Sequence, residues 1–186
     1  MTAQDDICTV ASIVEGFGEV QALPKLLHRL WPTLGAPGWL HTPVPHRLPR
    51  GQIVKPERLE AAVRVQSARV QGRGGILVVV DADDDDPAEL EARLAAAEAT
   101  KGVRLRVVAA VPEYEAWLLA GGAADDVDPE AHRDAKSLVS SLLLDEPYRE
   151  TRHQALLSQR LDVGRALSRS PSFRRLVHGL RELCSP

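Results

Sequence analysis

Acidic side chains follow an apolar run near the middle of the chain, and their spacing favours chemistry with a cation. The run Ile76–Val80 is rich in β-branched residues and is followed by Asp81, Asp83 and further aspartates up to Pro87. Such a run, bounded by glycines and a proline, is typical of a strand buried on both faces in a parallel sheet. Ligands of these sheets bind beyond the carboxyl ends of the strands, and side chains two apart on a strand share a face. We therefore expect Asp81 and Asp83 to reach one point, where their mutual repulsion favours a hard divalent ion such as Mg²⁺.

The same acidic segment also fits a helix start or a solvated loop. Asp85 or Asp86 precedes Pro87, and glutamates follow at the next turn, as is usual where a helix begins. We assign the helix-capping role to Asp85 and Asp86, and the site role to Asp81 and Asp83. An EF-hand is excluded, because a loop starting at Asp81 has no glycine at its sixth position and no glutamate at its twelfth.

Two more glutamates belong to the first strand–helix unit of the chain. Glu15 directly follows the β-rich run Ile7–Val14, and Glu19 comes one helical turn later. The carboxyl ends of parallel strands lie at one edge of a sheet, so we expect Glu15 to meet Asp81 and Asp83 there. Glu19 either joins this group or only complements the dipole of the helix that it begins, and both interpretations stay open.

Further candidates follow the later apolar run Val103–Val111. Glu113 and Glu115 are two residues apart, so on a helix they point in nearly opposite directions. The apolar stripe of this segment places Glu115 nearer the protein body and Glu113 nearer solvent, although both also fit a role as first-turn acids. Lys136 is a candidate cation for a phosphate or a developing negative charge.

The elements that would position these residues alternate between strand and helix up to Gly122. This order predicts an α/β fold with a mostly parallel, Rossmann-like sheet flanked by helices and a helical C-terminal extension. We expect one domain over residues 1–186, with a core of about residues 5–122 and a helical part of about residues 123–186. Pro24 is expected to delay the start of the first helix, and Pro112 is expected at the first position of a later one. The expected helices cover residues 56–71, 87–100, 112–120, 134–144, 149–160 and 172–183.

Composition fits an ordinary globular protein. The apolar fraction is 44% and the charged fraction 26%, and no apolar segment approaches the length of a membrane helix. Cys8 and Cys184 lie near opposite ends, with neither metal-ligand spacing nor a disulfide framework, which fits a reducing cytoplasm. The net charge of −3 does not indicate nucleic-acid binding, but acidic segments alternate with arginine-rich ones. That distribution suits a phosphodiester substrate over metal ions, and it equally suits solubility alone.

Taken together, the ordered motifs resemble the Toprim (topoisomerase–primase) fold over nearly the whole chain. The chain is most similar to a Toprim-like bacterial family of unknown function that is related to the Toprim nuclease part of the overcoming-lysogeny-defect (OLD) proteins. The motifs that carry the resemblance are Ile13-Val14-Glu15-Gly16 with Glu19, Val80-Asp81-Ala82-Asp83, Glu113-Tyr114-Glu115-Ala116-Trp117-Leu118-Leu119, Ala135-Lys136 and Ser172-Phe173-Arg174-Arg175-Leu176.

The resemblance implies metal-dependent phosphodiester chemistry on DNA or RNA, with Mg²⁺ or Mn²⁺ as the cofactor. It implies that Glu15 is a general acid or base or a metal ligand, and that Asp81 and Asp83 bind metal. Glu19 and Glu115 would complete a second metal site, and Lys136 would offset charge in the transition state. Paired ions of this kind activate a water and stabilise the leaving oxygen.

The chain departs from its relatives in lacking a topoisomerase tyrosine domain, a primase zinc module and the ATPase domain of OLD proteins. Any ATPase partner is therefore expected on a separate chain, and a homo-oligomer is compatible with the sequence. Some proteins related to this family are effectors in anti-phage defence. Two alternatives to a nuclease remain: a non-catalytic Toprim-fold binding or regulatory module, and a haloacid-dehalogenase-like phosphatase. The phosphatase fits less well, because its Asp-x-Asp strand should come first in the domain.

Overall fold

A parallel β-sheet forms the centre of the computed structural model, which describes residues 6–97, 102–122 and 127–185. Within these residues the sheet has five strands in the order β2-β1-β4-β5, and β3 pairs with the end of β1. All the pairings are parallel. The predicted α/β fold class, with helices flanking the sheet and a helical C-terminal part, is confirmed. The strands are β1 (Ile7–Val14), β2 (Trp39–His41), β3 (His46–Arg47), β4 (Arg73–Asp81) and β5 (Arg104–Ala110).

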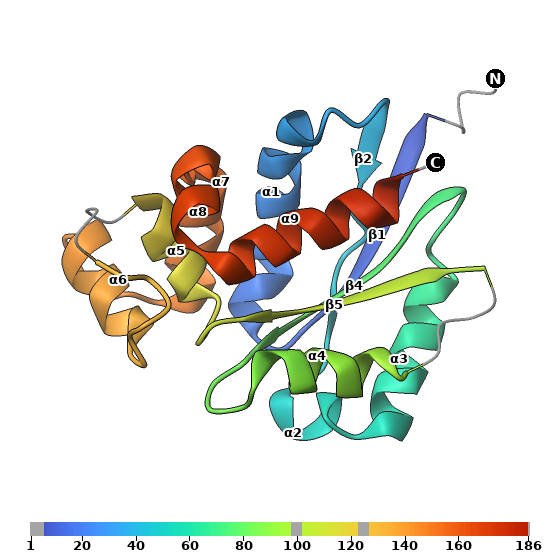
Figure 1. The fold of residues 1–186 in the computed structure, drawn as a ribbon, viewed down its shortest axis with the longest axis horizontal. Coiled ribbons are helices and arrows are strands. Elements are labelled where there is room, and N and C mark those ends of the chain that lie inside the picture. The colour runs from blue at the N-terminus through green and yellow to red at the C-terminus, as the bar shows by residue number, and fades with distance from the viewer. Residues whose placement is uncertain (1–5, 98–101, 123–126, 186) are drawn as a thin grey trace.

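Helices cover both faces of the sheet (Figure 1). One apolar cluster joins the sheet to α1, α5 and α9, and a second joins the opposite face to α3 and α4. None of the described helices combines the length and apolar character needed to cross a membrane. The helical elements are α1 (Phe17–Leu30), the 3₁₀ turn η1 (Trp31–Leu34), α2 (Arg50–Ile53), α3 (Pro56–Ser67), α4 (Pro87–Ala95), α5 (Glu115–Gly122), α6 (Ala135–Leu143), the π-helical turn η2 (Glu150–Gln154), α7 (Ala155–Arg160), α8 (Val163–Arg169) and α9 (Pro171–Cys184).

The strand order creates one position where the direction of the chain's winding reverses. From β1 the chain first adds β2 on one side, and then β4 on the other side of β1. The carboxyl ends of β1 and β4 therefore flank a topological switch point, which is where open α/β sheets bind ligands. In β4, the run Ile76–Val80 is buried on both faces, as its unbroken apolar sequence predicts.

Both proline predictions were wrong. Helix α1 begins at Phe17 and contains Pro24, because burial of its apolar stripe outweighs the one hydrogen bond that a proline removes. Pro112 follows a cis peptide bond after Val111 and lies outside a helix, and α5 begins only at Glu115. Asp86 does cap α4, since its side chain accepts a hydrogen bond from the Glu89 N–H.

Other expected boundaries shift by a few residues or lie outside the described residues. The helix predicted for residues 56–71 ends at Ser67, and the one for residues 87–100 ends at Ala95. Residues 98–101, which contain the predicted end of that helix, and the acidic pair at 125 and 126 lie outside the described part. The short helix α8, which the sequence pattern did not predict, lies between α7 and α9.

The cysteines do not behave as expected, because Cys8 and Cys184 form a disulfide. Helix α9 crosses the face of the sheet, and its C-terminal end lies beside the start of β1 (Figure 1). The two Cα atoms are 5.7 Å apart although 176 residues separate them along the chain. A pair with this separation has no local sequence signature, which is why the spacing of the cysteines gave no indication of it.

Candidate functional site

Glu15 and Asp81 meet at the switch point between β1 and β4. Glu15 follows the last residue of β1, and Asp81 is the last residue of β4. The backbone N–H of Asp81 donates a 2.7 Å hydrogen bond to Glu15 Oε2. Asp81 shares a face of β4 with Leu77 and Val79, which pack toward α1 and α5, so its carboxylate turns to the side where those helices begin. There, Asp81 Oδ1 accepts a 2.8 Å hydrogen bond from the Tyr114 N–H.

Glu19 is buried beside this pair and also holds the start of α1. Its side chain is in the first turn of the helix, and the residue is only 5% exposed. Glu19 Oε2 accepts the Glu15 N–H at 3.1 Å and so satisfies a backbone donor just before the helix begins. Gly16 lies close to this carboxylate, since a Cβ there would be 2.9 Å from Glu19 Oε1 and the Glu19 side chain would have to shift. This bond places a further carboxylate next to Glu15.

Glu115 enters the same group from α5. It is 1% exposed, and its Oε1 accepts hydrogen bonds from Tyr148 Oη at 2.6 Å and Gln154 Nε2 at 3.2 Å. Glu113 is only partly buried and faces α6. The expectation that Glu115 lies nearer the protein body than Glu113 is therefore confirmed.

Lys136 lies at the rim of the site, where it bridges two glutamates. Its Nζ is 2.7 Å from Glu150 Oε1 and 3.5 Å from Glu113 Oε2, and its own N–H donates to Glu113 Oε1 at 3.1 Å. These anions and Glu115 raise the pKa of the Lys136 amine against the opposite effect of burial, so it stays a cation. A cavity of about 420 Å³ opens beside it, lined by Lys136, Ser137, Ser140, Tyr148, Glu150 and Thr151.

Asp83 does not share a strand face with Asp81 as the alternation argument assumed. Strand β4 ends at Asp81, and Asp83 lies in the following turn with a left-handed φ of 50°. It is exposed, and it lines a cavity of about 160 Å³ with Asp84, Pro112, Glu113 and Arg133. Its charge nevertheless acts on Glu15 and raises the pKa of that carboxyl. Asp83 is therefore at the solvent side of the site.

Burial and mutual repulsion make this cluster electrostatically costly. Desolvation raises the pKa of Asp81 well above its ordinary value, and the charges of Glu19, Glu115 and Glu15 raise it further. Burial likewise raises the pKa of Glu19 to about 8 and that of Glu115 to about 7. Burial also raises the pKa of Glu15, although the Asp81 N–H and the Arg50 guanidinium act in the opposite direction. The cluster needs protons or an added cation to offset this repulsion.

The donor set has the chemistry of a hard-cation site. In Glu15, Asp81 and Glu115 the hydrogen bonds named above fall on one oxygen of each carboxylate, so the second oxygen is a candidate ligand. Gln154 adds a buried Oε1 that has no hydrogen-bond partner within the described structure. As these side chains stand, no three His, Cys, Asp or Glu residues of the described part are placed to hold a metal ion together. Binding of a cation would therefore require new rotamers among residues that already adjoin one another.

Several residues around the cluster were not predicted from the sequence. Arg50 Nη1 lies 3.6 Å from Glu15 Oε2 and donates to the Asp81 carbonyl oxygen, and Nη2 pairs with Asp85. Tyr148 and Gln154 reach Glu115 from a segment more than thirty residues further along the chain. The π-helical form of η2 is a feature often found at functional sites, but it has no reliable sequence signature.

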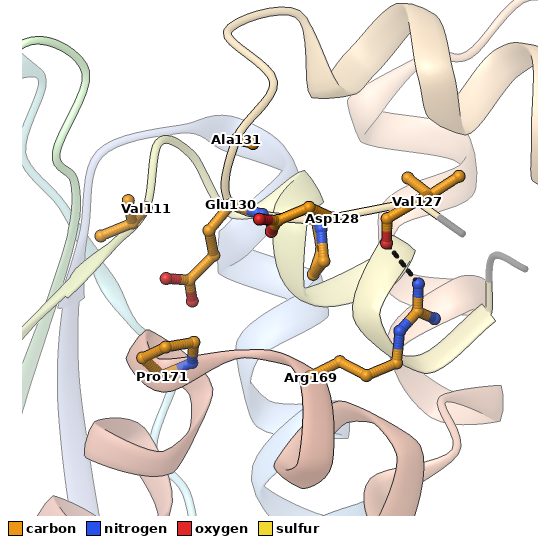
Figure 2. A pocket seen from close by; sticks show the side chains of 8 residues that line it. Val111, Val127, Asp128, Glu130, Ala131, Arg169 and Pro171 are labelled. Atoms are coloured by element: carbon orange, nitrogen blue, oxygen red, sulfur yellow. Dashed lines mark hydrogen bonds between the residues drawn. The ribbon is translucent and has the colours of Figure 1, made fainter. Parts of the chain in front are cut away.

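Figure 2 shows the lining of a larger cavity of about 600 Å³, which includes none of the clustered carboxylates. Its polar side chains are engaged in structural hydrogen bonds. Glu130 Oε1 accepts from the N–H and hydroxyl of Ser172, and Arg169 donates to the Val127 carbonyl oxygen at 2.6 Å. None of its lining residues belongs to the predicted site. They are Val111, Val127, Asp128, Pro129, Glu130, Ala131, Arg169 and Pro171.

Comparison with known proteins gives one weak likeness. No family model and no curated protein matches the chain. Among solved structures, the C-terminal region of the OLD protein of Xanthomonas campestris pv. campestris is similar over 93% of this chain and 94% of its own. The sequence identity is 14% and the TM-score 0.37, which is too low to carry an argument about fold or function.

Proposed function

We propose that this protein is a Mg²⁺- or Mn²⁺-dependent nuclease that acts on DNA or RNA. The observation that carries the proposal is the meeting of Glu15 and Asp81 at the switch point of the sheet, with Glu19 and Glu115 buried in the same cluster. Acidic groups gathered against their own repulsion indicate a site built for a cation. The ordered motifs that resemble the Toprim fold and the OLD-related family support phosphodiester chemistry as the use of that cation.

Each carboxylate has a proposed role. Glu15, Glu19, Asp81 and Glu115 would ligate metal from the protein side, and Asp83 would do so from the solvent side. When bound, paired divalent ions would activate a water and stabilise the leaving oxygen. Glu15 would also act as general acid or base, because it is the partly accessible carboxyl beside Asp81 with a raised pKa.

Lys136 is proposed to offset negative charge that develops on the phosphate. Its amine remains cationic and its side chain is 42% exposed at the rim, so a phosphate group can approach it. Contact with substrate would require Lys136 to exchange one of its bonds to Glu113 and Glu150. The other glutamate would meanwhile hold the amine in position.

The alternative of a non-catalytic binding or regulatory module has two observations in its favour. The carboxylates already accept hydrogen bonds from backbone N–H groups, Tyr148 and Gln154. In addition, no three metal-binding side chains of the described residues converge. A retained scaffold would keep these structural bonds and need no metal. The two functions differ in their response to divalent cations and in cleavage.

The decisive experiment compares Asp81→Asn with Asp145→Asn, an exposed aspartate in the loop after α6. Single- and double-stranded DNA and RNA are incubated with each protein in Mg²⁺, Mn²⁺ or EDTA, and folding is checked by circular dichroism. A nuclease cleaves at least one substrate only with the metal, and Asp81→Asn abolishes cleavage while Asp145→Asn does not.

Absence of divalent-dependent cleavage in the wild-type protein would overturn the nuclease proposal, as would full activity of Asp81→Asn. Turnover of a chromogenic phosphomonoester without polynucleotide cleavage would instead indicate a phosphatase. A role as an effector in anti-phage defence, with any ATPase supplied by a separate chain, predicts that bacteria producing the wild-type protein plate phage less well than bacteria producing Asp81→Asn. Equal plating on both strains would contradict this role.

A further inference from the structure

An exposed aromatic ring begins the helix that follows Glu15. Phe17 is the first residue of α1, two residues after Glu15, and it is 65% exposed. The other apolar residues of the α1 stripe are buried in the cluster that covers the sheet, whereas the Phe17 ring is open to contact from solvent. Phe17 is joined through Gly16 to Glu15, so the ring belongs to the same segment as the predicted ligands Glu15 and Glu19.

A guanidinium group lies on this ring. Arg47 Cζ is 3.7 Å from the centroid of Phe17, a cation–π contact. The contact arises because β3 pairs with the end of β1, with Arg47 opposite Val14. The pairing brings Arg47 to the place where the chain leaves the sheet toward Glu15 and Phe17.

The charge of Arg47 is not neutralised by a carboxylate of the described residues. Its Nε is buried without a hydrogen-bond partner in that part of the chain. Arg50, three residues later, behaves differently, since it pairs with Asp85 and lies close to Glu15. Phe17 thus carries a cation without a carboxylate partner in the described residues, whereas Arg50 is engaged at Glu15 itself.

We propose that Phe17 and Arg47 form a platform that binds single-stranded nucleic acid next to the candidate metal site. An unpaired base stacks on the face of the ring away from Arg47, and the guanidinium contacts a neighbouring phosphate. This inference rests on the proposed function, and it specifies a strand with unstacked bases as the substrate. A duplex keeps its bases stacked on one another, so it offers no free face to the ring.

The charge arrangement favours nucleic acid over an apolar partner. A single strand supplies both parts that the platform lacks, an aromatic face for Phe17 and an anion for Arg47.

The test measures binding of a fluorescently labelled 12-nucleotide single strand, as DNA and as RNA, by anisotropy with Ca²⁺ in place of Mg²⁺. Phe17→Ala should weaken binding about 5- to 150-fold, the loss expected for one base–aromatic stack, and Phe17→Tyr should restore it. Arg47→Ala should lower the slope of log affinity against log salt by about 0.7, and Arg47→Lys should keep it.

Matched controls are available at the other end of the molecule. Trp39, 77% exposed, pairs with Ile7 at the amino end of β1, and Arg64 lies exposed in the last turn of α3, which runs back toward that end. Trp39→Ala and Arg64→Ala should bind like the wild-type protein. Three results would overturn the platform. The control variants could lose as much single-strand affinity as Phe17→Ala, Phe17→Ala could bind with wild-type affinity, or the wild-type protein could bind a matched duplex as tightly as the single strand.

The platform and the nuclease proposal can fail separately. If Phe17→Ala and Arg47→Ala bind normally while Asp81→Asn abolishes cleavage, the platform is wrong and the nuclease stands. If both variants lose single-strand affinity but the wild-type protein cleaves nothing, the nuclease is wrong and the platform is the binding surface of a non-catalytic module.

Discussion

The Asp81 N–H donates a 2.7 Å hydrogen bond to Glu15 Oε2, so the ends of the two central strands are joined by the residues predicted to do chemistry. This bond makes Glu15 both a candidate ligand and a structural acceptor. Its side chain is only 10% exposed, and burial raises the pKa of its carboxyl. The structural role and the charge can be separated by choosing two substitutions.

Glu15→Gln should keep the fold and lose the response to metal. The amide oxygen can still accept the Asp81 N–H, while the desolvated charge disappears, so we expect an unchanged or higher melting temperature in EDTA. Glu15→Ala leaves that N–H without its acceptor and should lower the free energy of unfolding by about 1–3 kcal/mol. Thermal melts with and without Mn²⁺ would check both. Stabilisation of Glu15→Gln by Mn²⁺ to the wild-type extent would exclude Glu15 as a ligand.

The stability of the metal-free protein should fall as pH rises from about 4.5 to 8. Glu19 has a pKa of about 8 and Glu115 of about 7 in the folded protein, against an ordinary value of 4.5. In this window the folded state binds more protons than the unfolded state, so raising the pH favours unfolding. The loss should be on the order of a few kcal/mol, measured by urea unfolding in EDTA. Mg²⁺ or Mn²⁺ should reduce it, because a bound cation stabilises the ionised carboxylates.

Two glutamine variants provide the control for the pH effect. Glu19→Gln should flatten the dependence, whereas Glu57→Gln, on the exposed side of α3, should leave it unchanged. A free energy of unfolding that stays constant or increases between pH 5 and 8 would show that these carboxylates are not held in a desolvated, mutually repelling cluster.

The sequence was sufficient to predict the sheet and the strand ends that meet. The unbroken, β-branched run Ile76–Val80 is typical of a strand covered on both sides, and parallel strands place Glu15 and Asp81 at one edge whatever their exact neighbours. Glu115 could also be assigned to the interior from the apolar stripe around it. These inferences depend on local periodicity and on a general property of parallel sheets.

The remaining features depend on tertiary contacts that leave no local pattern. Tyr148 and Gln154 became partners of Glu115 only because η2 packs against α1. Asp83 was misplaced because the alternation of a strand was extended two residues beyond its end. The start of α1 was predicted too late, because the free-energy cost of Pro24 inside the helix is smaller than the gain from burying the apolar stripe.

Reduction of the Cys8–Cys184 disulfide should destabilise the protein by about 2–5 kcal/mol, because it releases a constraint on a loop of nearly the whole chain. Both cysteines are buried, so substitution by alanine, close in size, leaves little strain. We expect Cys8→Ala/Cys184→Ala to melt at the temperature of the reduced wild-type protein and to be insensitive to reductant. A wild-type melting temperature that does not change on full reduction, verified by thiol titration, would show that the bond does not contribute to stability.

Gly18→Ala should disturb the site through the contact of α1 with η2. A Cβ at this position would lie 2.3 Å from Gln154 Oε1 and 2.9 Å from Glu150 Cβ, and the backbone of Glu150 is 3.0 Å away. Gln154 would have to move, which weakens its hydrogen bond to Glu115, and we expect the free energy of unfolding to fall by about 1–3 kcal/mol.

Gly51→Ala is the matched control, because Gly51 also lies in a helix and has open space around its Cβ position. It should be neutral or slightly stabilising, since alanine favours helix over glycine. Urea unfolding measures both, and equal stabilities would mean that α1 and η2 do not pack closely enough to position Gln154 against Glu115.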